Sequence, residues 1–155
     1  MGYRNEIAYV VAFHHTEKPE VAHAEFIAFQ KWVKQHAIMD GNLNVESLYA
    51  YSDATKYCDH FKWYPQNGML LMRWEDVKWY ENYPSTQWHE QILSKCLLYQ
   101  TGAYRFVRIG ERYNDIEVIE RGDEDAKGYY LAEWVEPERG INFSTPSETE
   151  DKEAV

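Results

Sequence analysis

Residues 7–13 read Ile-Ala-Tyr-Val-Val-Ala-Phe, a run of β-branched, aromatic and small apolar side chains that indicates a buried strand. A turn follows, and Pro19 suits the first turn of a helix, where its missing N–H has no partner to lose. Apolar residues then recur at helical spacing: Ala22, Phe26, Phe29, Val33 and Ala37. This spacing predicts a helix of about 19 residues that ends near Gly41.

Working outward, the chain predicts three further strands, over 45–51, 69–74 and 104–109. A second helix is expected to begin at Pro84, with Ser85 or Thr86 as its N-cap. Its apolar stripe consists of Trp88, Ile92, Cys96 and Tyr99. Gly102 is expected as the C′ residue after this helix. The polar and aromatic stretch 53–67 is expected to be a loop or a distorted hairpin.

The resulting order, β-α-β-β-α-β, places two amphipathic helices against one face of an antiparallel sheet. This predicts the α+β class with a ferredoxin-like arrangement, and a barrel or roll from the same strands is the alternative. Residues 111–121 and 129–136 predict an acidic β-hairpin extension around the turn 122–128. We expect one domain over 1–143 and a short, disordered acidic tail over 144–155.

The bulk composition favours a folded protein in a reducing compartment. Aromatic residues make up 16% of the 155 residues, which is too much packing material for a disordered chain. Cys58 and Cys96 imply no disulfide framework, and no apolar run approaches the roughly 18 residues that span a bilayer. The apolar run near the N-terminus is too short for a signal peptide. We therefore expect a cytoplasmic protein with no membrane partner.

Motifs for catalysis and cofactors do not assemble from this sequence. His14 and Thr16 form one H-x-T, but no second copy follows to supply a paired acid and base. Cys58, His60 and His89 lack the ligand spacing of a structural zinc site. Nucleophile-elbow, P-loop and dinucleotide-binding patterns do not occur. We predict no catalytic residue, no metal and no cofactor, and favour a protein that is not an enzyme.

The charge of the chain is concentrated in its last third. Residues 111–155 hold 14 acidic against five basic residues, whereas residues 1–110 hold 12 against 11. The last 12 residues account for only −3 of this imbalance of −9, so most of the charge belongs to segments expected to be ordered. A net negative charge disfavours bulk attraction to nucleic acid or anionic lipid.

The first hypothesis is therefore a binding protein that engages a basic protein surface through its acidic hairpin. Such a ridge of carboxylates would act as a nucleic-acid mimic or inhibitor, of the kind that phages and mobile elements encode. The expected partner-binding residues are Asp115, Glu117, Glu120, Asp123, Glu124, Asp125, Glu133 and Glu136.

Two alternatives use the aromatic residues instead. A single-stranded nucleic acid would stack on exposed rings beside basic side chains. The expected aromatic surface consists of His60, Trp63, Tyr64, Trp74 and Trp79. The other alternative is a protein that binds or sequesters a small ligand such as a nucleotide, or a small enzyme, with an aromatic-lined pocket between sheet and helices. An uncovered sheet face or edge would favour a homodimer.

Overall fold

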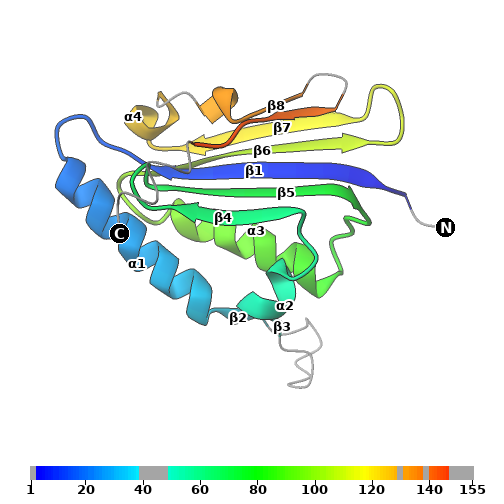
Figure 1. Ribbon diagram of the computed structural model, residues 1–155, viewed down its shortest axis with the longest axis horizontal. Coiled ribbons are helices and arrows are strands. Elements are labelled where there is room, and N and C mark those ends of the chain that lie inside the picture. Colours follow the sequence, from blue (N-terminus) through cyan, green and yellow to red (C-terminus); the bar gives the residue numbers. More distant parts are fainter. Residues whose placement is uncertain (1–2, 39–48, 129–130, 138–139, 147–155) are drawn as a thin grey trace.

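The computed structural model describes residues 3–38, 49–128, 131–137 and 140–146. These residues form an α+β structure around a five-stranded antiparallel sheet with the strand order β4-β5-β1-β6-β7 (Figure 1). The strands are β1 (Asn5–Phe13), β4 (His60–Tyr64), β5 (Met69–Val77), β6 (Gly102–Gly110) and β7 (Ile116–Gly122). The two long helices are α1 (Pro19–Gln35) and α3 (Pro84–Cys96).

The central strand β1 is apolar throughout because both of its faces are covered. Ile7, Tyr9, Val11 and Phe13 pack in the cluster that includes the buried faces of α1 and α3. Ala8, Val10 and Ala12 pack in a second cluster with residues of the C-terminal segment. The strand predicted for 7–13 is confirmed, and it begins two residues earlier, at Asn5.

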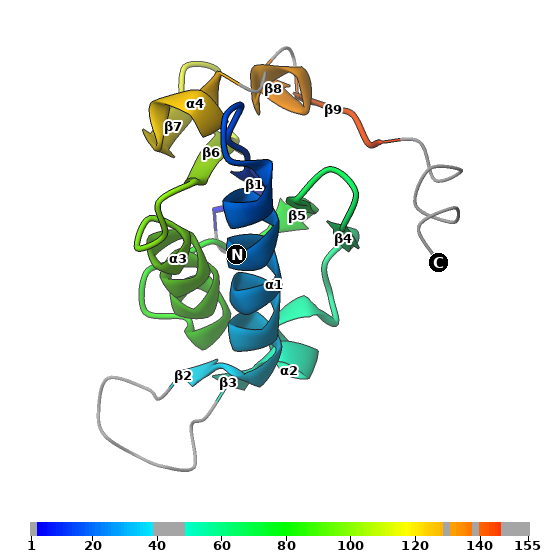
Figure 2. The ribbon, with the colours of Figure 1, turned by 90° about the vertical axis from the view of Figure 1, so that its left-hand side faces the viewer.

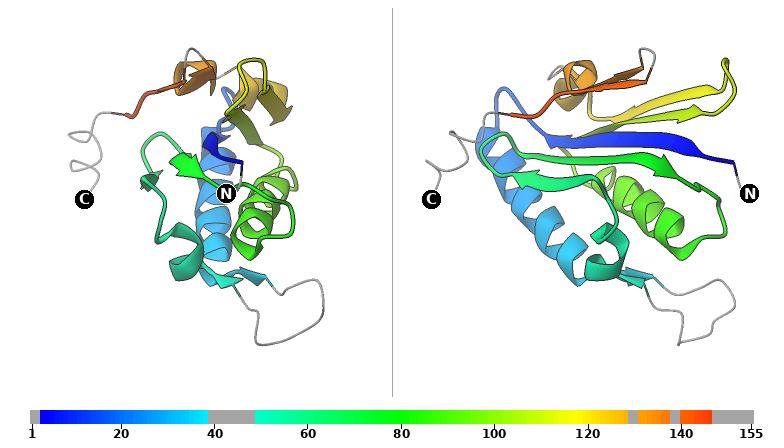
Figure 3. Two further views of the ribbon diagram at one scale, coloured as in Figure 1. Left: turned by 90° about the vertical axis from the view of Figure 1, so that its right-hand side faces the viewer. Right: turned by 45° about the vertical axis from the view of Figure 1, so that its right-hand side comes forward.

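The C-terminal segment covers the sheet face opposite to α1 and α3, as Figure 2 shows. It contains α4 (Glu124–Lys127), the 3-10 turn η2 (Leu131–Glu133), β8 (Val135–Pro137) and β9 (Ile141–Phe143). Its apolar contribution to the second cluster is Ala126, Leu131, Val135 and Ile141. Both sheet faces are thus occupied within one chain, and the two views in Figure 3 agree with this layering.

The predicted hairpin between 111–121 and 129–136 is wrong. The strand β7 pairs with β6, in a register that runs from Ile109↔Ile116 to Ala103↔Gly122, and β8 pairs with β9. The neighbouring strand β6 offers β7 a full-length partner, while the apolar residues after Gly122 are needed to cover β1. The chain leaves β7 at Gly122, whose φ of +123° favours glycine.

The second strand of the prediction is also misplaced. Within the described residues, 45–51 contributes only β3 (Tyr49–Ala50), which pairs with β2 (Ala37–Ile38) and leads into α2 (Tyr51–Thr55). Residues 45–48 lie outside the described part. The edge strand β4 instead comes from the stretch 53–67, which was expected to be a loop or a distorted hairpin, and it forms an antiparallel hairpin with β5. Five strands in this order do not match the predicted four-stranded ferredoxin-like sheet in full.

The ends of the helices differ from the predictions in detail. The N-cap of α3 is Tyr83, and Thr86 is buried inside the helix rather than capping it. The residue Gly102 begins β6, where a Cβ atom would lie 2.2 Å from the carbonyl oxygen of Cys96. At the other end of the chain, the Ser144 N–H donates to the Trp134 carbonyl at 2.9 Å. The predicted tail is therefore bound at its start, and from residue 147 it lies outside the described residues. No helix in the described ranges is long and apolar enough to cross a membrane.

Candidate functional site

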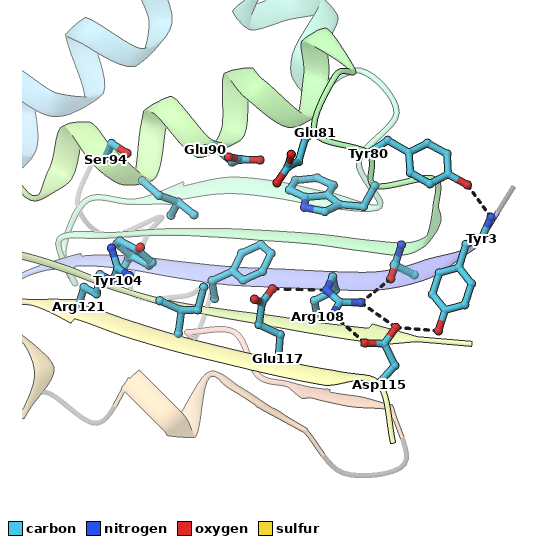
Figure 4. Close-up of a pocket in the computed structure, with 15 residues that line it drawn as sticks. Tyr3, Tyr80, Glu81, Glu90, Ser94, Tyr104, Arg108, Asp115, Glu117 and Arg121 are labelled. Atoms are coloured by element: carbon cyan, nitrogen blue, oxygen red, sulfur yellow. Dashed lines mark hydrogen bonds and ion pairs between the residues drawn. The ribbon is translucent and has the colours of Figure 1, made fainter. Parts of the chain in front are cut away.

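A groove of about 530 Å³ lies between α3 and the outer strands β6 and β7, and we call it the α3–β7 groove (Figure 4). It forms on the helix-covered face of the sheet, where β7 extends the sheet past α3. The groove is lined by Tyr3, Asn5, Trp79, Tyr80, Glu81, Glu90, Leu93, Ser94, Tyr104, Phe106, Arg108, Asp115, Glu117, Ile119 and Arg121.

Aromatic rings form the inner wall of the groove. The rings of Trp79 and Phe106 lie 6.0 Å apart at an interplanar angle of 37°. Behind them, Trp74 meets Trp79 edge to face at 5.8 Å, so the Trp79 ring is supported by the core. Alternation along β6 directs Tyr104, Phe106 and Arg108 to this same face.

The guanidinium of Arg108 lies at the floor of the groove and holds several lining side chains by hydrogen bonds. It donates to both carboxylate oxygens of Asp115, at 2.8 and 3.1 Å, and its Nε donates to Glu117 at 3.4 Å. It also donates to the side-chain oxygen of Asn5 at 3.1 Å. The Tyr3 hydroxyl donates to Asp115 at 2.7 Å (Figure 4). The hydrogen bonds from Arg108 and then from Tyr3 lower the pKa of Asp115 to about 2.

Two further carboxylates, Glu81 and Glu90, enter the groove from the helix side (Figure 4). Partial desolvation, and then the nearby charges of Glu81 and Glu117, raise the pKa of Glu90 above its usual range. Among the described residues, no basic side chain forms an ion pair with Glu81 or Glu90. The lining therefore holds four carboxylates and two guanidinium groups, and one of the latter, Arg108, is already engaged.

The chain matches no family model, no curated protein and no solved structure. What the groove does is therefore inferred from its own chemistry.

The acidic residues predicted to form one ridge are divided between the two faces of the sheet. Glu117 and Asp115 face the groove and pair with Arg108. Glu120 and Glu136 lie on the opposite face, where both pair with Arg105 at 3.1 and 3.0 Å. The structure thus brings these residues together with basic partners of the same chain, rather than with one another.

The remaining predicted acids lie near α4 and η2. The side chain of Asp123 accepts from the backbone N–H groups of Asp125 and Ala126, and so caps α4. The carboxylate of Asp125 accepts from the N–H and the hydroxyl of Thr16. The Glu124 side chain is 90% exposed and pairs with Lys127, and Glu133 is exposed. Glu117 and Glu120 are exposed as well, but each pairs with an arginine of the sheet, so Glu124 and Glu133 are the predicted residues best placed to meet a partner.

The predicted aromatic surface is distributed through the molecule. Tyr64 and Trp74 are buried in different clusters, on opposite faces of the sheet. Trp63 packs edge to face on Phe26 and Phe29 of α1, and His60 stacks with Tyr64. Of the five predicted rings, Trp79 alone lines the groove.

Several groove residues escaped the sequence-based prediction, above all Glu81, Glu90 and Arg108. Their signal was present but weak. Tyr104, Phe106 and Arg108 alternate along a predicted strand, which places an aromatic pair and a cation on one face. The identity of the element facing them depends on tertiary packing, which no local pattern specifies.

Proposed function

We propose that the protein binds a small molecule in the α3–β7 groove. The observation that carries this proposal is a cavity of about 530 Å³ that joins an aromatic wall to several converging polar groups. Ligand pockets in proteins are typically about 300–1,000 Å³, with apolar and aromatic walls and a few placed polar groups. The proposal takes up the alternative of an aromatic-lined pocket between sheet and helices.

The groove is organised before any ligand arrives. Arg108 is held by three side chains, and the Trp79 ring rests on Trp74 and on the buried His89, whose ring centroid lies 6.0 Å away. Ordering side chains on binding costs roughly 0.5–1.5 kcal/mol for each one immobilised, and fixed groups avoid much of that cost. This preorganisation supports a role in recognition.

We propose binding or sequestration rather than chemical turnover. The described residues that line the groove include no histidine and no cysteine, and among them the Ser94 side chain makes no hydrogen bond to a basic group. The groups that the groove does supply are rings, carboxylates and guanidinium groups, which recognise ligands by stacking and by charge.

The test is a screen of small-molecule fragments by nuclear magnetic resonance on the ¹⁵N-labelled full chain. Hits are expected to shift the amide signals of α3, β6 and β7. The substitution Ser94→Trp places a large ring at an exposed position of the groove and should abolish binding. The matched control, Ser52→Trp, makes the same change on an exposed position of α2 and should preserve it. Hits that map elsewhere, or that survive Ser94→Trp, would overturn the proposal.

A second candidate function is the binding of a basic protein surface by the acidic residues of 111–136. The exposure of Glu124 and Glu133 favours it, because both carboxylates are accessible without disrupting the fold. The test is a pull-down from the native host with the chain carrying Glu124→Lys and Glu133→Lys, compared with the unchanged chain. Loss of a salt-sensitive basic protein supports this candidate, and unchanged recovery contradicts it.

We also propose that the sheet is a ferredoxin-like sheet enlarged by one strand. With β7 set aside, the order β4-β5-β1-β6 corresponds to the second, third, first and fourth strands of a β-α-β-β-α-β chain. A fold of this kind carries many unrelated functions, so it adds nothing to the assignment of the ligand.

A further inference from the structure

We infer that the α3–β7 groove selects a small organic cation with a flat aromatic body. This inference rests on the proposed function and names the class of ligand. It follows from two features of the cavity that occur together: an aromatic wall, and carboxylates that no basic residue of the described chain neutralises.

The charge of the groove lining indicates that the ligand is positively charged. Glu81 and Glu90 face the cavity from the segment before α3 and from α3 itself, and Glu117 faces it from β7 (Figure 4). These three carboxylates line the same cavity, and the charges of Glu81 and Glu117 contribute to the raised pKa of Glu90. Arg108 is shared between Asp115 and Glu117, so it offers little positive charge to a ligand. A bound ammonium group would relieve the repulsion between the carboxylates.

The aromatic wall indicates that the uncharged part of the ligand is a flat aromatic ring. A cation gains from contact with the face of an indole or phenyl ring within about 6 Å of its centroid. A flat ring of the ligand also stacks well in offset or tilted geometry on Trp79, which is the more exposed ring of this wall and is backed by the buried Phe106. One ligand satisfies both features when its ring rests on this wall and its ammonium group reaches Glu81 and Glu90.

An anionic ligand such as a nucleotide is disfavoured by the same arrangement. Its phosphates would have to lie near Glu81, Glu90 and Glu117. The other guanidinium of the lining, Arg121, lies at the far end of the groove beside Tyr104 (Figure 4). The groove thus separates a negative middle from a single positive end.

The test compares three probes that share an indole ring and differ in charge: tryptamine (cationic), 3-methylindole (neutral) and indole-3-acetate (anionic). Isothermal titration calorimetry with the full chain at low ionic strength is expected to give the tightest binding for tryptamine. Raising the salt concentration should weaken tryptamine most, because ion pairs near the surface are screened. Equal or tighter binding of the neutral or the anionic probe would overturn the inference.

Variants locate the charge effect. Glu81→Gln and Glu90→Gln are each expected to weaken tryptamine binding about threefold, and together about tenfold, while leaving 3-methylindole unchanged. The matched control is Glu133→Gln, an exposed carboxylate on η2 outside the groove lining. If tryptamine affinity is unchanged in the double variant, the inference is wrong.

The same measurements separate this inference from the proposed function. If all three probes bind alike and Ser94→Trp abolishes all of them, the groove binds ligands and the preference for a cation falls. If no probe binds while the fragment screen finds other ligands in the groove, the inference falls alone. If the fragment screen also places no ligand there, the proposed function falls with it.

Discussion

The hydroxyl of Tyr9 lies 2.8 Å from Nδ1 of His89, and both side chains are fully buried. The other ring nitrogen of His89, Nε2, lies 3.1 Å from the carbonyl oxygen of Ala54. Because a carbonyl only accepts, Nε2 carries the proton and Nδ1 accepts from the Tyr9 hydroxyl. This places a neutral, fully hydrogen-bonded imidazole between the central strand β1 and the helix α3.

The protein is expected to become less stable as the pH is lowered, because His89 is neutral in the folded protein. Burial lowers its pKa from the usual 6.5 to about 4, against a smaller opposing effect of the hydrogen bond to Ala54. Below pH 6.5 the imidazole of His89 is protonated in the unfolded chain but stays neutral in the folded chain. The contribution of His89 to the free energy of unfolding is therefore lost progressively between pH 6.5 and pH 4. The loss amounts to about 3 kcal/mol. Titration of the imidazole by nuclear magnetic resonance checks this, and a His89 midpoint near 6.5 would contradict it.

Removing the Tyr9 hydroxyl is expected to destabilise the fold although the ring volume hardly changes. The substitution Tyr9→Phe leaves Nδ1 of His89 buried without a donor, and an unsatisfied buried acceptor costs about 1–3 kcal/mol. Urea denaturation measures this change. The control Tyr113→Phe removes a hydroxyl from a fully exposed ring and should leave the free energy of unfolding unchanged. Equal stability of the two variants would contradict the role of the hydrogen bond.

The elements predicted best are those whose pattern is local and strong. Of the five residues of the predicted α1 stripe, Ala22, Phe26, Phe29 and Val33 are buried in α1, whereas the helix ends at Gln35 and Ala37 belongs to β2. The strands β1, β5 and β6 were likewise indicated by apolar and aromatic residues, interrupted by Arg73 in β5 and by Arg105 and Arg108 in β6. These patterns succeed because they are set by burial alone: the apolar face of α1 packs on one layer, and β1 is apolar throughout because its alternate residues pack on two covered faces.

The acidic segment shows where local pattern fails. The strand predicted over 111–121 is confirmed only from Ile116 onward, as β7. The choice of its partner is not local, and β6 forms the ladder in place of residues 129–136. Arg105 and Arg108 lie directly across from Glu120 and Glu117 in that ladder. The opposite charges agree with this register, but they become informative only once the two strands are known to be neighbours.

The sequence indicated that a pocket could be lined by aromatic residues, but not where in the fold such a pocket would lie. An aromatic-lined pocket between sheet and helices was one of the alternatives, and Trp79 was named separately, as a stacking residue for single-stranded nucleic acid. The residues that line the groove with Trp79 come mainly from α3, β6 and β7. How close these elements lie to one another depends on the tertiary packing of α3 on the sheet. The buried state of His89 was equally inaccessible, because a helix pattern does not distinguish a core histidine from one at a surface.

Arg105 is expected to hold the C-terminal segment on the sheet. Its side chain is 13% exposed, pairs with Glu120 and Glu136, and donates from Nε to the Val135 carbonyl at 2.9 Å. The substitution Arg105→Gln should speed amide hydrogen exchange in β8 and β9 by about tenfold or more, since charged hydrogen bonds contribute roughly 1.5–3 kcal/mol. The control Arg4→Gln changes a half-exposed arginine whose pair with Asp76 spans 3.8 Å. Exchange rates in β8 and β9 that match the control would contradict this role.

Reversing the charge of Asp115 is expected to destabilise the protein, whereas reversing Glu133 is not. Asp115 accepts from Arg108 and from Tyr3, so Asp115→Lys would place two cations together and free the Tyr3 hydroxyl. Glu133 has no such partners among the described residues and should tolerate lysine. Thermal denaturation should show a midpoint lower by about 2–4 °C or more for Asp115→Lys than for Glu133→Lys. If the two midpoints agree, the pair with Arg108 contributes no stability, and Asp115 becomes as available to a basic partner as Glu133.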